Sequence, residues 1–389
     1  MDGIVYLDNS ATTRICDEAL RKYNEVSTGF FGNPSSLHKM GFDAEKLLSD
    51  ARGEILRSLG ARSHKVIFTA SGSEANNLAL IGRAFAKDRY RHGRKIITTL
   101  GEHASVNEPL LRLEKEGFRI VNVPTVGGEI DIDRLTAELD ESVILVSAMM
   151  VNNETGAVYD ISKLAKLTHA RAPEALVHVD ATQSYMKLPI SLSTLPVDML
   201  TLSSHKIEGP KGVGALVVTD KVVTSKGLSP LILGGGQEGG LRSGTENVPA
   251  VAAFGEAVRV YSTHRTERYD AMLSLSEYLI AQIKEKLPEI SITTPKLRAA
   301  HILNITLPGI KSETMLHFLS SRGIFVSSGS ACSSNDLSHR SSALIAFGRS
   351  EKEADASLRI SLSHRNTRDD IDALISALTD GLSRLQRMK

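Results

Sequence analysis

Short apolar runs alternate with amphipathic segments from residue 66 to residue 218, and this alternation constrains the fold more than any other feature. Each run has the length and the β-branched content of a strand, and the segments between them carry apolar residues at helical spacing. Strands joined through helices run in the same direction, so the chain is predicted to be an α/β protein with a mainly parallel sheet. Seven strands are predicted, at 66–69, 95–99, 120–123, 143–149, 176–180, 199–202 and 213–218.

The pattern changes after Gly255. Apolar residues at a spacing near 3.6 predict a long helix through residues 269–283 and a last helix beginning after Thr367, the expected N-cap. Between them the sequence predicts strands at 301–307, 324–326 and 358–362 and a helix at 313–322. We therefore predict a large domain over 14–260 and a smaller α/β domain made of 1–13 and 261–389.

Composition excludes several classes of protein. The chain has 389 residues, 41% of them hydrophobic, and a net charge of +1, so neither nucleic acid nor a membrane is expected as a direct partner. It has no apolar run of transmembrane length, and its first residues lack the pattern of a signal peptide. Its two cysteines, without a CxxC spacing, argue against a disulfide framework and against a cysteine metal site. The predicted compartment is the reducing cytoplasm.

A lysine and an aspartate follow two of the predicted strands. Asp180 ends one strand, and Lys206 follows the next in the sequence Ser-Ser-His-Lys. Strand ends in α/β proteins open into the loops that carry chemistry, so the two side chains are expected to converge. Pyridoxal phosphate needs such a pair, because a lysine binds its aldehyde and a carboxylate keeps its ring nitrogen protonated. The alternative is a surface lysine, but Gln183, Ser203 and His205 nearby favour the cofactor.

A glycine- and serine-rich turn follows the first predicted strand and precedes an apolar helix. The free N–H groups and partial positive charge at a helix start form an anion site, and Gly72 and Ser73 suit a phosphate there. Ser203 and His205 are candidates for the other side of the same phosphate. The alternative is simple capping, in which Ser71 or Ser73 only starts the helix.

Two further strand ends carry candidates for the ring of the cofactor. His103 follows the strand 95–99, where an imidazole could stack on the ring and act as an acid or a base. Asn153 follows the strand 143–149 and could place its amide, together with that of Gln183, against the phenolic oxygen. The alternatives are a capping histidine and a polar turn, in which asparagine is common.

Cys332 is the candidate nucleophile. It lies in a serine- and glycine-rich stretch with few apolar residues, which predicts a mobile and exposed loop. A cysteine in such a setting is unusual, because free cysteines are among the most commonly buried residues. Cys16 has no comparable setting and is interpreted as structural.

Together these residues resemble the cysteine desulfurases of the NifS/IscS type, which are class V aminotransferase-like enzymes with the pyridoxal phosphate transferase fold type I. The resemblance covers nearly the whole chain. It is carried by residues 6–13, 31–36, 102–103, 151–154, 178–184, 203–206, 236–238, 242–245 and 327–332.

The resemblance implies an enzyme that converts L-cysteine to L-alanine and leaves a persulfide on Cys332. It also implies a homodimer in which Thr245 reaches the phosphate of the partner subunit. Arg359, with Asn33 beside it, would bind the substrate carboxylate. The remaining roles that it implies are Lys206 as the Schiff-base lysine, Asp180 at the ring nitrogen, His103 on the ring, Gln183 and Asn153 at the phenolic oxygen, and Gly72, Ser73, Ser203 and His205 at the phosphate.

The chain departs from the family in three places. Ser363-His364-Arg365 stands where Gly-Arg is usual, and Gly239 stands where an arginine is common. The chain ends at Lys389, directly after its last predicted helix, without the tail that docks the scaffold in IscS members. The sulfur acceptor therefore stays open between an iron–sulfur scaffold and another sulfur-acceptor protein. The alternative activities are those of a selenocysteine lyase and of a pyridoxal phosphate-dependent aminotransferase.

Overall fold

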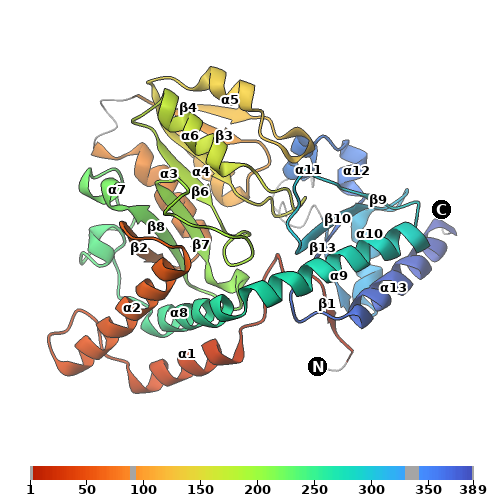
Figure 1. The fold of residues 1–389 in the computed structure, drawn as a ribbon, viewed down its shortest axis with the longest axis horizontal. Coiled ribbons are helices and arrows are strands. Elements are labelled where there is room, and N and C mark those ends of the chain that lie inside the picture. Colours follow the sequence, from red (N-terminus) through yellow and green to blue (C-terminus); the bar gives the residue numbers. More distant parts are fainter. Residues whose placement is uncertain (1–2, 88–92, 329–340, 388–389) are drawn as a thin grey trace.

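The computed structural model describes residues 3–87, 93–328 and 341–387. Cys332 lies outside these described residues. A central sheet with helices on both faces occupies one side of the molecule, and a smaller group of strands and helices lies beside it (Figure 1). None of the described helices combines the length and the apolar character needed to cross a membrane.

The central sheet has seven strands in the order β2-β8-β7-β6-β5-β3-β4. β8 runs antiparallel to both of its neighbours, and the other neighbouring strands are parallel. The mainly parallel, seven-stranded α/β fold predicted from the sequence is therefore confirmed. The strands are β2 (His64–Thr69), β3 (Lys95–Thr99), β4 (Arg119–Val123), β5 (Val143–Met149), β6 (Leu176–Asp180), β7 (Met199–Ser203) and β8 (Gly214–Thr219).

Helices cover both faces of this sheet (Figure 1). Within the described residues, short 3-10 helices lie in the loops, namely η2 (Val126–Gly128), η3 (Ser204–Lys206) and η4 (Glu238–Gly240). The α-helices are α1 (Asp17–Gly29), α2 (Lys39–Ser58), α3 (Gly72–Ala84), α4 (Ala104–Lys115), α5 (Ile132–Glu138), α6 (Ile161–Arg171), α7 (Asp220–Thr224) and α8 (Val248–Thr263).

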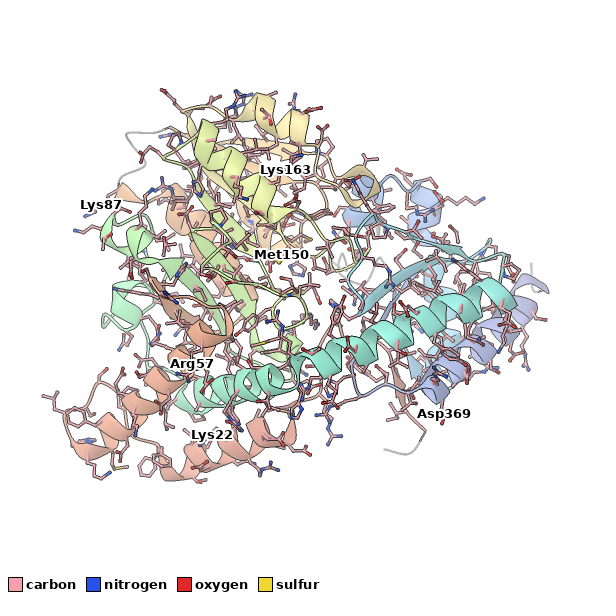
Figure 2. The ribbon with its side chains drawn as sticks, viewed as in Figure 1. Lys22, Arg57, Lys87, Met150, Lys163 and Asp369 are labelled. Carbon is pink, nitrogen blue, oxygen red and sulfur yellow. The ribbon has the colours of Figure 1, made fainter. Side chains whose placement is uncertain are left out.

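Successive strand residues point to opposite faces, so each strand contributes to two cores. Ile96 and Leu216 belong to a core with α3 and α4, whereas their neighbours Ile97 and Val217 belong to a core with α2, α6 and α8. The strands are therefore apolar on both faces, which explains why they read as continuous apolar runs in the sequence. Charged side chains such as Arg57 and Lys163 lie on the outside of the molecule (Figure 2).

The C-terminal part of the chain builds a second apolar core, which also contains Leu7 from the N-terminal segment. Its helices and strands are α9 (Arg265–Lys286), α10 (Ser312–Ser320), α11 (Ser342–Phe347), α12 (Glu351–Asp355), α13 (Arg368–Arg387), β1 (Val5–Tyr6), β9 (Ser291–Ile292), β10 (Ile302–Thr306), β11 (Ile324–Phe325), β12 (Ser327–Ser328) and β13 (Ser357–Ser361). β12-β13-β10-β9 form one sheet, and β1 pairs with β11. The division of the chain at residues 14 and 260 stays a prediction.

Thr367 caps the last helix, as predicted. Its hydroxyl accepts a hydrogen bond from the backbone N–H of Asp370 at 3.3 Å, and its own N–H donates to the Asp370 carboxylate at 3.0 Å. This reciprocal pair occupies two donors that would otherwise lack partners at the helix start.

Candidate active site

A cavity of about 400 Å³ lies where β6 and β7 end, between these strands and residues of the N-terminal segment and of β13. Lys206 and Asp180 both line it. Parallel strands end at the same edge of a sheet, which is why residues far apart in sequence meet here. Most of the predicted site residues line this cavity, namely Gly72, Ser73, His103, Asn153, Asp180, Gln183, Ser203, His205, Lys206 and Arg359.

Two predicted site residues in the described part of the chain, Asn33 and Thr245, do not line it. Asn33 is exposed, and its side-chain oxygen accepts a hydrogen bond from the N–H of Ser35 at 2.9 Å. Thr245 is exposed in the loop before α8. Cys332 lies outside the described residues. The roles assigned to these three residues stay predictions.

A chain of hydrogen bonds joins Asp180 to His103. One oxygen of Asp180 accepts from the Asn76 amide at 2.8 Å, and the other accepts from the N–H of Thr182 at 2.8 Å. The same Asn76 amide donates to the Ser105 hydroxyl at 2.8 Å, and this hydroxyl lies 2.8 Å from His103 Nδ1. Both carboxylate oxygens are thus oriented by donors. Asn76 was not predicted, although its place in the second turn of α3, three residues after Ser73, was an available signal.

His103 is held in one orientation. It is the N-cap of α4, and its Nδ1 accepts a hydrogen bond from the N–H of Ser105 at 3.1 Å. Because Nδ1 accepts, the neutral ring carries its proton on Nε2. Burial lowers the pKa of His103, and Asp180 opposes this shift. The neutral form with a proton on Nε2 is therefore favoured near pH 7.

The start of α3 lines one end of the cavity. Ser71 is the N-cap, and its hydroxyl accepts from the N–H of Glu74 at 3.1 Å, so the capping role belongs to Ser71 and leaves Ser73 in the cavity wall. A Cβ atom added at Gly72 would lie 3.2 Å from Ser203 Cβ and 3.3 Å from the Thr182 hydroxyl. Any larger residue there would narrow this end of the cavity.

The N-terminal segment forms a wall of the cavity that the sequence did not predict. Lys206 Nζ donates to the carbonyl oxygen of Ser10 and, at 2.7 Å, to that of Ala11. Thr13 anchors the same segment, since its N–H and its hydroxyl donate to the carbonyl oxygen of His205 at 3.0 and 2.8 Å. The matching motif at 6–13 was visible in the sequence, but its place in the site was not.

Arg359 reaches the cavity from β13. It is 3% exposed and donates to the Asp8 carboxylate at 2.8 Å and to the Asn153 carbonyl oxygen at 3.1 Å. Its Nε is buried and has no hydrogen-bond partner within the described part of the chain. A buried guanidinium with donor capacity left over suits a carboxylate ligand.

The residues present fit pyridoxal phosphate. Gln183 donates from Nε2 to the Ser10 carbonyl oxygen at 3.0 Å, but its Oε1 and the Ser10 hydroxyl are buried without partners among the described residues. Polar atoms left in this state cost free energy unless a ligand or water pairs with them. A lysine, an oriented carboxylate and a free helix start around these atoms match the aldehyde, the ring nitrogen and the phosphate of this cofactor.

Glu102 gives a pH dependence that can be measured. It is 3% exposed, one oxygen accepts from the Thr99 hydroxyl and from the N–H of Met149, and the other has no partner among the described residues. Burial raises its pKa from 4.5 to about 8. The folded protein therefore binds a proton that the unfolded chain releases, so Glu102 lowers the free energy of unfolding as pH rises from 4.5 to 8.

Glu102→Gln, which mimics the protonated acid, is expected to remove this dependence. Its stability relative to the wild type should be constant below pH 4.5 and should rise by up to about 1.4 kcal/mol per pH unit towards pH 8. Urea unfolding of both proteins, saturated with cofactor, at pH 5, 6, 7 and 8 measures the difference. A difference that does not change with pH would contradict the protonated state of Glu102.

Asn76→Ala is expected to lower kcat for the expected reaction, the formation of L-alanine from L-cysteine. It removes a hydrogen bond to the Asp180 carboxylate and interrupts the chain to His103, and a hydrogen bond to a charged group contributes about 1.5–3 kcal/mol, or roughly 10- to 100-fold. The measurement is kcat per bound cofactor together with the absorption maximum of the cofactor. Asn77→Ala is the control, because Asn77 lies on the same helix and, among the described residues, its amide donates to the carbonyl oxygen of Ser73 alone. Equal kcat in the two variants would exclude the role of Asn76.

Several known proteins are similar to this chain in sequence and in structure. The family model described as aminotransferase class-V matches residues 5–374. A NifS/IcsS protein homolog of Lactobacillus delbrueckii subsp. bulgaricus is 38% identical over 97% of both chains. The cysteine desulfurase IscS 1 of Archaeoglobus fulgidus is 35% identical over 98% of both chains. A solved NifS-like protein superposes with a TM-score of 0.89 at 33% identity, covering 98% of this chain and 99% of its own.

Proposed function

The chain belongs to the aminotransferase class-V family, and within it we propose that the protein is a pyridoxal phosphate-dependent cysteine desulfurase. The observation that carries the proposal is the meeting of Lys206, Asp180, His103 and Arg359 at one cavity. Relatives described as cysteine desulfurases, aligned over nearly the full length of this chain, support it. L-cysteine is the proposed substrate.

The cofactor would be held at both ends of the cavity. Gly72, Ser73, Ser203 and His205 would bind the phosphate, and Asp180 would pair with the ring nitrogen. Gln183 and Asn153 would contact the phenolic oxygen, and Lys206 would bind the aldehyde. When bound, pyridoxal phosphate withdraws electrons from the α-carbon of the substrate.

The side chains of this protein would then divide the reaction among them. Arg359 binds the carboxylate of L-cysteine and so fixes its α-carbon relative to Lys206. The Lys206 amine takes the α-proton, and His103 supplies a proton or a hydrogen bond from Nε2. The Cys332 thiolate attacks the substrate sulfur, the carbon–sulfur bond breaks with its electron pair going to carbon, and protonation gives L-alanine. The sulfur remains on Cys332 as a persulfide.

A homodimer is proposed from large apolar side chains that are exposed in the described part of the chain. Phe31, Leu37 and Phe42, before and within α2, are 72%, 91% and 63% exposed, and Leu233 in the loop before η4 is 79% exposed. Large apolar side chains in such numbers indicate a surface that another chain covers. In this arrangement exposed Thr245 would reach the phosphate of the partner subunit, and Asn33 would lie near the substrate.

The persulfide is proposed to pass to an iron–sulfur scaffold or another sulfur-acceptor protein in the cytoplasm. The low cysteine count suits a reducing compartment, and a thiol acceptor can take the outer sulfur by exchange. Delivery to cluster assembly is one form of this proposal.

The proposed activity is tested with purified protein, pyridoxal phosphate, L-cysteine and a thiol reductant. Equal amounts of sulfide and L-alanine are expected. An aminotransferase would instead convert an amino donor to its 2-oxo acid without releasing sulfide, and a selenocysteine lyase would turn over L-selenocysteine but not L-cysteine. Either result would replace the proposed function.

A further inference from the structure

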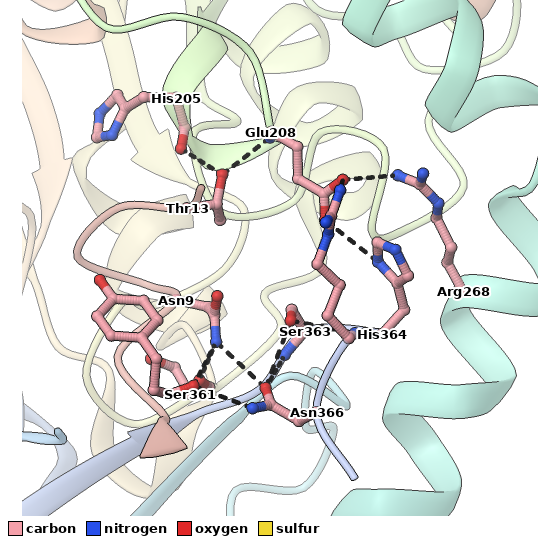
Figure 3. Close-up of polar contacts among 11 residues, drawn as sticks. Asn9, Thr13, His205, Glu208, Arg268, Ser361, Ser363, His364 and Asn366 are labelled. Carbon is pink, nitrogen blue, oxygen red and sulfur yellow. Dashed lines mark hydrogen bonds and ion pairs between the residues drawn. The ribbon is translucent and has the colours of Figure 1, made fainter. Parts of the chain in front are cut away.

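Glu208 is a buried carboxylate two positions after Lys206. It is 3% exposed, and its oxygens lie 3.3 Å from Arg268 Nη1 and 3.4 Å from Nε and Nη2 of Arg365 (Figure 3). His364 Nδ1 lies 3.3 Å from the same carboxylate. Burial lowers the pKa of His364 although Glu208 opposes this shift, so the two arginines supply the lasting positive charge. A buried charge needs such partners, and removing one is costly.

The backbone of Glu208 is fixed as firmly as its side chain. Its N–H donates to the Thr13 hydroxyl at 2.9 Å (Figure 3). Its carbonyl oxygen accepts from the N–H of Cys16 at 2.8 Å. Its φ of 63° lies in the left-handed region, which is strained for a residue with a side chain. A Cβ atom at the next residue, Gly209, would lie 2.1 Å from the Ser204 hydroxyl, so the turn after Lys206 is closed tightly. The contacts of Glu208 offset its backbone strain.

The arginine partners of Glu208 come from two other parts of the fold. Arg268 lies on α9, and Arg365 lies in the segment that follows β13, the strand of Arg359. Asn366 fixes that segment, because its oxygen accepts from the N–H of Ser363 at 2.9 Å and its amide donates to the carbonyl oxygen of Tyr6 at 3.0 Å (Figure 3). The segment that departs from the usual family sequence is thus the one that contacts Glu208.

From this arrangement we propose that Glu208 is a positioning residue that fixes the spacing between Lys206 and Arg359. The inference rests on the proposed function, in which Arg359 holds the substrate carboxylate and Lys206 takes the α-proton. These two groups belong to different elements, so a rigid contact between their supports sets their distance. The carboxylate of Glu208, joined to Arg365 on one side and to the turn of Lys206 on the other, provides such a contact. Small displacements of reacting groups have large effects on rate.

The test begins with Glu208→Gln, which keeps the shape of the side chain and removes its charge. We expect kcat for alanine formation, per bound cofactor, to fall on the order of tenfold while KM for L-cysteine changes by less than about threefold. The reason is that Arg359 still binds the carboxylate but Lys206 is displaced from the α-carbon. A purely structural role would lower the melting temperature without changing kcat per cofactor, and that result would overturn the proposal.

A double-mutant cycle tests the contact itself. Arg365→Gln alone should lower kcat in the same way but less, since its side chain is 38% exposed and Arg268 remains. In Glu208→Gln/Arg365→Gln the loss should not exceed that of Glu208→Gln alone by more than about twofold, because both changes break one contact. If the two losses of kcat multiply in the double variant, Glu208 and Arg365 act independently, and the proposed contact is contradicted. If Glu208→Gln does not fold, Arg365→Gln alone decides, and wild-type kcat in that variant would reject the proposal.

Glu138→Gln is the matched control. Glu138 is also a buried carboxylate with several cations around it, namely Lys95 at 3.0 Å, Arg119 at 3.3 Å and Arg134 at 2.8 Å. Glu138 lies at the amino ends of the strands, opposite the cavity. The Glu138→Gln variant should therefore be less stable than the wild type but have the same kcat for alanine formation. Wild-type protein that makes no alanine from L-cysteine would reject the proposed function. Active wild type with an equally active Glu208→Gln would reject only the positioning role.

Discussion

Lys206→Ala is expected to retain no covalently bound pyridoxal phosphate after borohydride reduction. The Lys206 amine lines the cavity beside Asp180 and His103, and an alanine leaves no amine at that position. We also expect alanine formation to fall by roughly 1,000-fold, because the same amine moves the α-proton. The measurements are the mass of the reduced protein, the visible absorption of the bound cofactor and the rate of alanine formation.

Lys211→Ala is the control for this experiment. Lys211 lies in the same loop but is exposed and does not line the cavity. It should keep covalent attachment and most of the activity. Covalent cofactor in reduced Lys206→Ala protein, or its loss in Lys211→Ala, would show that the lysine has been assigned wrongly.

Cys332→Ser is expected to separate cofactor chemistry from sulfur transfer. The variant should bind pyridoxal phosphate and change its absorption on addition of L-cysteine, since these steps use Lys206, Asp180 and Arg359. Alanine formation under reducing conditions should fall at least on the order of 100-fold, because a serine hydroxyl is barely ionised near neutral pH and is a poor nucleophile toward sulfur. Mass spectrometry of the wild type after one turnover should find the added sulfur on Cys332.

Cys16→Ser is the matched control, since Cys16 is the other cysteine of the chain. It is 2% exposed and packs against Ala19, Ala253 and Ala257. Burial raises the pKa of its thiol, which keeps it in the unreactive protonated form. The variant should therefore make alanine at close to the wild-type rate. Substantial activity in Cys332→Ser, or its loss in Cys16→Ser, would require another nucleophile.

The sequence determined the fold and part of the site through local patterns. Strand and helix periods follow from backbone geometry, so runs such as 143–149 and 176–180 coincide with β5 and β6. The parallel arrangement then brings strand ends to one edge, which is why the order of residues along the chain is enough to predict that Asp180 and Lys206 line the same cavity. The N-cap of the last helix could also be predicted from neighbouring residues, because Thr367 and Asp370 are three residues apart.

The tertiary structure decided what surrounds these groups. Asn76 holds Asp180 across 104 positions of sequence, Ser10 meets Lys206 across 196, and Glu208 meets Arg365 across 157. The spacing of apolar residues within one helix or strand cannot encode such partners, because these depend on how separately formed elements pack. Polar side chains with several possible partners reach their final ones only when burial removes water as a competitor. The sequence by itself therefore determined the elements and the chemistry at their ends, and packing alone determined which side chains orient that chemistry.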